Sequence, residues 1–158
     1  MPDLSMPEKM RSKPRFLSAK EIKKLIAKAE EPFKTILLPL ALAGMRINEV
    51  LGLHVEDIDF EEKFIHVTKS AYNGTLGTPK SKASEANILL STTLEEALRK
   101  HLASEHYREN LLGVLFANRR LGSYSDNKLR AKSLRPLLKF LGMKQVGFHA
   151  IRHTVASE

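Results

Sequence analysis

The chain has 158 residues, of which 42% are hydrophobic and 28% charged, a composition that fits one globular domain with a real core. It contains no cysteine, which excludes disulfides and thiolate metal sites, and no apolar run reaches the length of about 18 residues that a membrane span requires. Because the first residues are polar and resemble no secretory signal, we expect a soluble protein of the cytoplasm.

The net charge of +8 is concentrated in one part of the sequence. Between residues 110 and 157 there are nine lysines and arginines and a single acidic residue, Asp126, so this segment alone carries the whole excess. A localised excess of this kind is typical of proteins that bind a polyanion, nucleic acid first. A solvated, solubilising face would have the same composition, and charge alone does not decide between the two.

The first third of the chain predicts a tail followed by three helices. The tail, residues 1–15, has prolines and scattered charges without periodicity. Ser18 and Glu21 have the spacing of a capping box, in which each side chain bonds the backbone N–H of the other, so a helix should begin there. Pro39 lies inside an apolar run and is expected to kink that helix or to reset its start. The three helices are expected over residues 18–29, 33–43 and 46–53.

The middle of the chain predicts a small antiparallel sheet. Residues 55–59 are expected to form a turn, and β-branched and aromatic residues predict a strand over 63–67. Asn73-Gly74 and Gly77 mark a flexible turn. Return strands are then expected over residues 78–83 and 86–90.

The C-terminal part predicts helices again. Leucines recur at helical spacing over residues 94–106, and Ser125 is positioned to cap a leucine-rich helix that Gly142 ends. A short apolar run covers 114–116, and another helix begins at 148. Together these elements predict an α+β fold that is mainly α-helical, with one small antiparallel β-sheet.

Arg46 is the first candidate functional residue. It follows Gly44, which permits a sharp turn, and it lies at the expected start of a helix. Unpaired backbone N–H groups at such a start attract anions. A guanidinium held there between core leucines is well placed to bind a phosphate or a carboxylate.

Two pairs of residues are further candidates. His149 and Arg152 are three residues apart, so both side chains lie on one side of a helix, where Arg152 could hold an anion and His149 could carry a proton. Taken alone, this pattern is more often a helix end with a solvated arginine. Lys80 and Lys82 lie on the predicted hairpin, where a lysine can act as a proton donor or a phosphate ligand, although surface lysines on hairpins are common.

The combination of these features is more specific than any one of them. The segments GMRINEVLGL at 44–53, VEDID at 55–59, TPK at 78–80 and HAIRHT at 149–154 follow one another in the chain. In this order they resemble the catalytic domain of tyrosine recombinases, also called phage integrases. The resemblance implies a tail at residues 1–15 and a catalytic domain at residues 16–158 that is incomplete at its C-terminus.

The resemblance also implies a chemistry. Arg46 matches the family's first catalytic arginine, and Lys80 the hairpin lysine that protonates the leaving 5′ hydroxyl. Two arginines would clamp the scissile phosphate while a tyrosine attacks it, without metal or cofactor. The implied catalytic residues are Arg46, Lys80, His149 and Arg152, with Glu49, Lys82 and His153 in supporting positions. The partner implied is double-stranded DNA, contacted through Arg119, Arg120, Lys128, Arg130, Lys132 and Arg135.

The implied biology is site-specific DNA recombination or integration for a mobile element, near the nucleoid of a bacterium or a phage-infected host. The sequence departs from the family's pattern, because Tyr72, Tyr107 and Tyr124 do not occupy the place of the nucleophile. We therefore expect the chain ending at Glu158 to bind DNA without cleaving it. We also expect a monomer that assembles on DNA only when full length. The alternative hypothesis is a non-catalytic DNA-binding module from a degenerate integrase, in which the basic segment binds phosphates and Arg46 has no special role.

Overall fold

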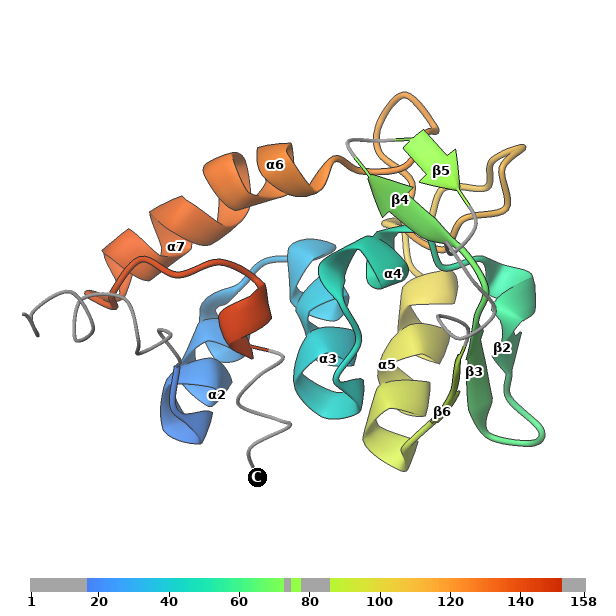
Figure 1. Cartoon of the computed structure of the whole chain (residues 1–158), viewed down its shortest axis with the longest axis horizontal. Helices are drawn as coiled ribbons and strands as arrows, with labels where there is room; N and C mark the ends of the chain where they lie inside the picture. Colours follow the sequence, from blue (N-terminus) through green and yellow to red (C-terminus); the bar gives the residue numbers. More distant parts are fainter. Residues whose placement is uncertain (1–16, 73–74, 78–85, 152–158) are drawn as a thin grey trace, which may run out of the picture.

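The structure is a computed structural model that describes residues 17–72, 75–77 and 86–151. Figure 1 shows three helices, α2, α3 and α5, standing side by side, with a small sheet beyond α5 and the segment α6–α7 running across one end. The predicted α+β class, mainly helical with a small antiparallel sheet, is confirmed. None of the described helices is long and apolar enough to cross a membrane.

Helix α2 (Ala19–Lys28) begins where the capping box predicted. The Ser18 hydroxyl accepts a hydrogen bond from the Glu21 backbone N–H at 3.1 Å, and the Glu21 carboxylate accepts one from the Ser18 N–H at 2.9 Å. The helix is amphipathic, with Ile22 and Leu25 buried against the core.

Helix α3 (Phe33–Ala43) is apolar nearly all round and forms the centre of the core. Pro39 lies inside it, so the proline neither ends the helix nor resets its start. Gly44 ends the helix with φ 70°, a left-handed conformation that glycine adopts at little cost. The next helix, α4 (Ile47–Leu51), is shorter than the predicted 46–53, because Arg46 is its N-cap and Gly52 its C-cap.

The strands among the described residues form two antiparallel groups. The three-stranded sheet has the order β2-β3-β6, where β2 is Ile58–Asp59, β3 is Phe64–Val67 and β6 is Ala86–Leu89. The separate hairpin pairs β4 (Ser70–Tyr72) with β5 (Thr75–Gly77).

Two details of the predicted sheet were wrong. The stretch 55–59 is not simply a turn, because a 3-10 helix η1 (Val55–Asp57) leads into β2, whose Ile58 pairs with Ile65 and is buried. Gly77 belongs to β5 rather than to a turn. The return strand predicted over 78–83 lies outside the described residues, whereas the one over 86–90 is confirmed as β6.

Helix α5 (Thr92–Leu102) packs against α3 and buries Leu94 and Leu98. It ends four residues before the predicted end at 106. The Ser104 hydroxyl donates to the His101 carbonyl at 2.7 Å and accepts from the His106 N–H at 3.1 Å, which closes a turn in place of another helical turn.

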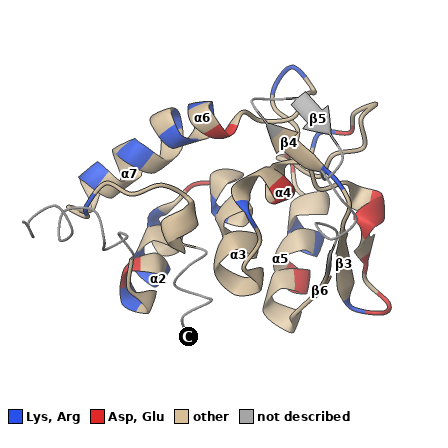
Figure 2. Ribbon diagram, in the orientation of Figure 1, with Lys and Arg blue, Asp and Glu red and all other residues tan. Residues whose placement is uncertain are grey.

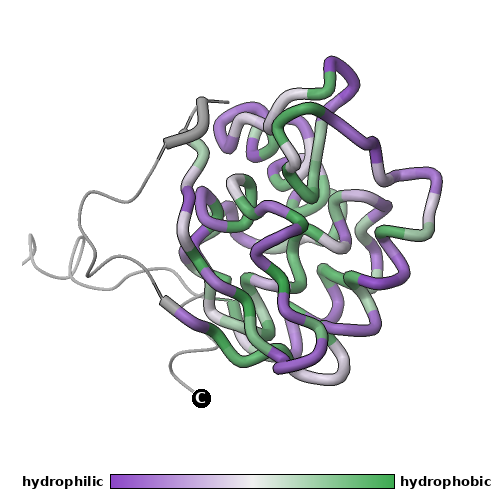
Figure 3. The backbone as a smooth tube through the Cα atoms, turned by 90° about the vertical axis from the view of Figure 1, so that its right-hand side faces the viewer, coloured by the Kyte–Doolittle hydropathy of each residue, from purple (hydrophilic) through white to green (hydrophobic). Residues whose placement is uncertain are grey.

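The leucine-rich helix predicted between Ser125 and Gly142 is present, with one irregular turn. It consists of α6 (Asp126–Leu129), a π-helical turn η3 (Arg130–Leu134) and α7 (Arg135–Phe140). Residues 149–151 form a further helical turn, and the Phe148 ring packs edge-on against Phe33 with centroids 6.2 Å apart. In Figure 3 the loops that protrude from the body of the protein are largely hydrophilic.

Buried His101 is expected to make the stability of this fold depend on pH. Its Nε2–H donates to the Leu115 carbonyl at 3.2 Å, and its ring lies 4.8 Å from that of Phe116. Burial lowers the pKa of His101, because the imidazolium ion would lose its hydration there, although the bond to Leu115 acts in the opposite direction.

We expect the stabilising contribution of neutral His101 to be complete above the ordinary histidine pKa of about 6.5 and to be lost as the pH falls through the lowered value in the fold. Thermal unfolding between pH 7.5 and 5 would measure it. His101→Gln, which keeps an N–H donor but cannot titrate, should flatten the decline in melting temperature that the native protein shows. Parallel declines in the two proteins would assign the pH dependence to other groups.

Candidate functional site

Arg46 is anchored at the start of α4 by Glu49. The Glu49 carboxylate accepts a hydrogen bond from the Arg46 backbone N–H at 2.9 Å, and its second oxygen lies 3.7 Å from the Arg46 Nη1. The Arg46 side chain is 64% exposed, whereas that of Glu49 is only 17% exposed. The backbone of Arg46 is therefore fixed while its guanidinium faces solvent, an arrangement suited to forked hydrogen bonds to a phosphate.

The residues around Arg46 explain why it lies there. Met45 and Val50, on either side of it, are fully buried, so the segment is pinned to the core while Arg46 points outward. The predicted position at a helix start is confirmed. Since α4 is only five residues long, the guanidinium and not the helix dipole is the group there with a charge suited to an anion.

Helix α4 also contacts two other elements of the candidate site. It packs against β4 and against α6. At its C-terminal end Gly52 lies so close to β4 that a Cβ atom would be 2.8 Å from the Ser70 backbone. The His54 ring bonds the Gly52 carbonyl through Nδ1 at 2.8 Å. The hairpin and the basic helical segment are thus both held next to the helix that carries Arg46.

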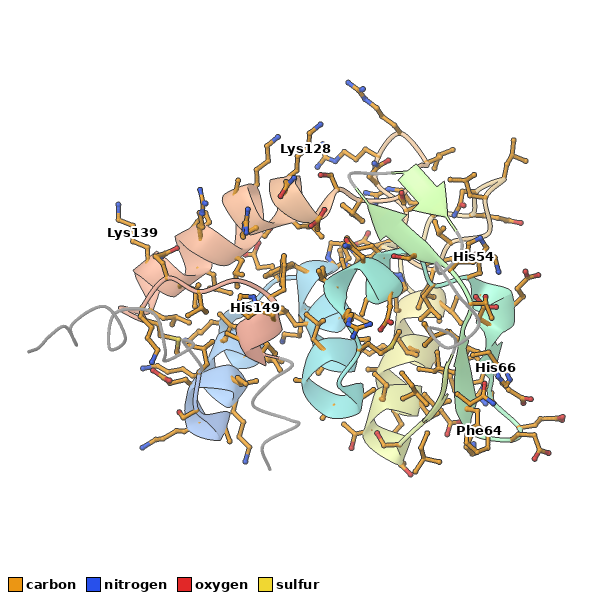
Figure 4. The ribbon with its side chains drawn as sticks, viewed as in Figure 1. His54, Phe64, His66, Lys128, Lys139 and His149 are labelled. Atoms are coloured by element: carbon orange, nitrogen blue, oxygen red, sulfur yellow. The ribbon has the colours of Figure 1, made fainter. Side chains whose placement is uncertain are left out.

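His149 is described, but its predicted partners are not. Figure 4 shows His149 on the helical turn at 149–151, where Ala150 and Ile151 are fully buried and His149 is exposed. Arg152, His153, Lys80 and Lys82 lie outside the described residues. The predicted convergence of Arg46, Lys80, His149 and Arg152 on one surface therefore stays a prediction.

The segment α6–η3–α7 carries a row of basic side chains. Lys128, Lys132 and Arg135 are exposed, and Figure 2 shows lysines and arginines along the outer side of this segment. Figure 4 shows Lys128 and Lys139 pointing away from the body of the protein. Lys139 was not among the expected DNA contacts, although its spacing of 11 residues from Lys128, three helical turns, was the signal for a shared face.

Two more arginines stand on a tight loop before α6. Arg119 and Arg120 are exposed. The Asn118 side-chain oxygen accepts hydrogen bonds from the Arg120 N–H at 2.9 Å and the Gly122 N–H at 3.0 Å, so the loop is held by its own polar groups. Arg130 differs from the others because it is half-buried and donates to the Asn127 side chain at 3.4 Å.

No three acidic or histidine side chains of the described ranges are grouped as a metal site would require.

The chain resembles known recombinases along nearly its whole length. The tyrosine recombinase XerC of Thermodesulfovibrio yellowstonii is 30% identical over 161 residues, which cover 93% of this chain and 49% of that protein. The integrase of Salmonella phage P22 is 26% identical, over 99% of this chain and 39% of the integrase.

Solved structures give the same result for the fold. The crystal structure of XerA recombinase superposes with a TM-score of 0.74 and 26% identity, over 91% of this chain and 49% of XerA. The Tn1549 transposon integrase, solved in complex with circular intermediate DNA, has a TM-score of 0.76 over 93% of this chain and 55% of the integrase. At 19% identity, this second likeness concerns the fold alone.

The chain spans about half the length of the Xer recombinases that it resembles. The sequence signature of the phage integrase family matches residues 15–158. With its mainly helical fold, its anchored arginine at the start of α4 and its basic C-terminal helices, the chain belongs to the phage integrase family.

Proposed function

We propose that residues 16–158 are the catalytic domain of a tyrosine recombinase, which binds double-stranded DNA and serves site-specific recombination, and that residues 1–15 are a tail. The observation that carries this proposal is the position of Arg46. An exposed guanidinium with its backbone tied to Glu49 suits the recognition of a fixed phosphate better than it suits stabilising the fold, because an exposed ion pair contributes little to stability.

In the proposed reaction Arg46 and Arg152 bind the non-bridging oxygens of the scissile phosphate. Their charges stabilise the negative charge that develops as a tyrosine hydroxyl attacks phosphorus and a 3′-phosphotyrosyl bond forms. His149 assists proton transfer at the phosphate, and Lys80 gives a proton to the departing 5′ oxygen, which leaves as a hydroxyl; Lys82 and His153 are nearby in the sequence. The same attack in reverse, from another strand's 5′ hydroxyl, rejoins the DNA and releases the tyrosine.

DNA backbone binding is proposed for the basic residues of the tight loop and of α6–η3–α7. The support is the exposure of Arg119, Arg120, Lys128, Lys132 and Arg135 and the row of lysines and arginines on the outer side of α6–η3–α7, since several cations on one surface can contact several phosphates of a duplex. Arg130 is half-buried and is included for its place in this row. The proposal includes a monomer in the absence of DNA that assembles on DNA, and a location at the nucleoid. The residues concerned are Arg119, Arg120, Lys128, Arg130, Lys132 and Arg135.

The salt dependence of DNA binding tests this function. We expect the protein to bind a fluorescently labelled duplex with an affinity that falls steeply as salt rises. The double variant Lys128→Ala/Lys132→Ala should reduce the slope of log affinity against log salt by about two, because each phosphate contact contributes about 0.9. Fluorescence anisotropy at several salt concentrations gives both quantities.

A matched control removes two lysines with the same spacing elsewhere. Lys20 and Lys24 are exposed and four apart on α2. Their double alanine variant should keep most of the slope, since α2 is not part of the proposed DNA surface. Equal losses in the two double variants would indicate a general charge effect, and the absence of binding by the unaltered chain would contradict the proposed function.

A further inference from the structure

A groove lies between the loop 118–125 and the first turns of the basic helical segment. Its volume is about 800 Å³. Lys128 and Lys132 line it together with side chains that can donate hydrogen bonds, Ser125, Asn127 and Ser133 among them. No carboxylate is found among its lining residues, so its electrostatic character is cationic. Arg46 does not line it, and the groove is distinct from the site proposed for the scissile phosphate.

The stretch of chain that borders this groove contains buried polar atoms without partners among the described residues. Ser123, one of its lining residues, is 4% exposed, and its hydroxyl has no hydrogen-bond partner among the described residues. One oxygen of Asp126 and the Nε of Arg130 are buried and unpaired in the same segment. Most buried polar side-chain atoms in folded proteins are paired, so the unpaired Ser123 hydroxyl needs an explanation; of these three residues, Ser123 is the one that lines the groove.

The loop that carries Ser123 is held in advance of any ligand. The Asn118 N–H donates to the Gly122 carbonyl at 2.8 Å, and the Asn118 side-chain amide donates to the Ser123 carbonyl at 3.1 Å. The Ser123 backbone is therefore fixed while its hydroxyl lacks a partner. A site whose donors are already ordered binds a ligand with less loss of conformational entropy.

We propose that this groove seats a backbone phosphate of bound DNA, apart from the scissile phosphate, and the inference rests on the proposed function. A phosphodiester offers acceptor oxygens and a negative charge, which match a serine hydroxyl and two lysines and leave no need for a carboxylate. The Ser123 hydroxyl donates to a phosphate oxygen, and Lys128 and Lys132 neutralise the charge. Because the hydroxyl is recessed, the side chains that cover it must shift for the phosphate to reach it, while the hydrogen-bonded backbone of the loop stays in place.

The variant Ser123→Ala separates this role from a structural one. Removing an unpaired buried hydroxyl should leave the melting temperature unchanged or raise it. Affinity for a labelled duplex should nevertheless fall about tenfold, the usual effect of losing one hydrogen bond to a charged group. The slope of log affinity against log salt should stay the same, because serine carries no charge.

Ser91→Ala is the matched control. The Ser91 hydroxyl accepts a hydrogen bond from the Leu94 N–H at the start of α5, at 3.3 Å, and it is not part of the groove. This substitution should lower the melting temperature, because a helix cap is lost, and leave DNA affinity as it was. The two serines should thus show opposite patterns in the same two measurements.

The outcomes test the phosphate site in the groove separately from the proposed function. If Ser123→Ala binds the duplex as tightly as the unaltered protein, or if it loses stability and affinity together, the proposed phosphate site in the groove is wrong. Salt-dependent binding by the unaltered protein would still support the proposed function in that case. If the unaltered protein does not bind the duplex at all, the proposed function fails and the proposed phosphate site with it.

Discussion

Replacing Arg46 by alanine is expected to slow DNA strand cleavage by about 10²–10³-fold, the usual effect of losing one preorganised donor to a developing negative charge. The guanidinium is exposed, and its backbone is fixed by the Glu49 carboxylate at 2.9 Å, so it meets the phosphate without reorganisation. The fold should be unaffected, because the ion pair with Glu49 is solvent-exposed on the arginine side and contributes little to stability.

The measurement uses a nicked duplex that traps the covalent protein–DNA product. The rate is measured on a polypeptide that includes the nucleophilic tyrosine, and duplex binding by residues 1–158 is measured in parallel. Arg46→Lys is the control for charge, because lysine keeps the cation but lacks the planar fork. It should recover only part of the rate lost in Arg46→Ala.

The result also separates the two functional hypotheses. In a non-catalytic DNA-binding module, Arg46→Ala would leave duplex binding unchanged, while the Lys128→Ala/Lys132→Ala variant would weaken it. In a catalytic domain, Arg46→Ala should slow strand cleavage and the Lys128→Ala/Lys132→Ala variant should weaken duplex binding, so each variant is detected in its own assay. An unchanged melting temperature in Arg46→Ala ensures that any loss of activity reflects chemistry at the phosphate rather than unfolding.

The parts of the fold that the sequence predicted are those determined by neighbours in the chain. The capping box of Ser18 and Glu21 and the left-handed Gly44 are local signals, so the helix start at Ala19 and the helix end at Ala43 were both found. Strand pairing depends on distant residues. Ile58 is a strand residue only because it pairs with Ile65, and local turn signals at 55–59 concealed this.

In the candidate site, too, some features have a local signal in the sequence and others arise only in the folded chain. The exposed position of Arg46 at a helix start followed from its glycine and its flanking apolar residues. The π-helical turn at Arg130–Leu134 had no signal in a leucine pattern that also fits an ordinary α-helix. The unpaired Ser123 hydroxyl could not be predicted either, because its burial arises from segments that meet only in the folded chain.

Gly52→Ala is expected to lower the stability of the fold markedly, although it adds only one methyl group. A Cβ at this position would lie 2.8 Å from both the Cα and the carbonyl carbon of Ser70 and 2.9 Å from the Ala71 nitrogen. These are backbone atoms of β4, so no side-chain rotation relieves the contact. Since φ of Gly52 is −93°, alanine fits the backbone conformation there, and the whole cost is steric.

Overpacking of this kind costs about 1–3 kcal/mol, which urea denaturation would measure as a fall in the free energy of unfolding. Gly122→Ala is the matched control, because the nearest atom to its added Cβ is 3.9 Å away. It should change the free energy of unfolding by less than about 0.5 kcal/mol, as substitutions without a steric conflict usually do. Equal effects of the two substitutions would contradict the close packing of α4 on β4.

Gly52→Ala should also lower activity, because Gly52 lies where helix α4, which carries Arg46, meets strand β4. Helix α4 carries Arg46 at one end and touches β4 at the other, so an added methyl group must push the hairpin and the helix apart. We therefore expect Gly52→Ala to lower strand cleavage even at a temperature where the variant is fully folded. Full activity in the folded variant would mean that Arg46 keeps its position independently of β4, and that the glycine serves the fold alone.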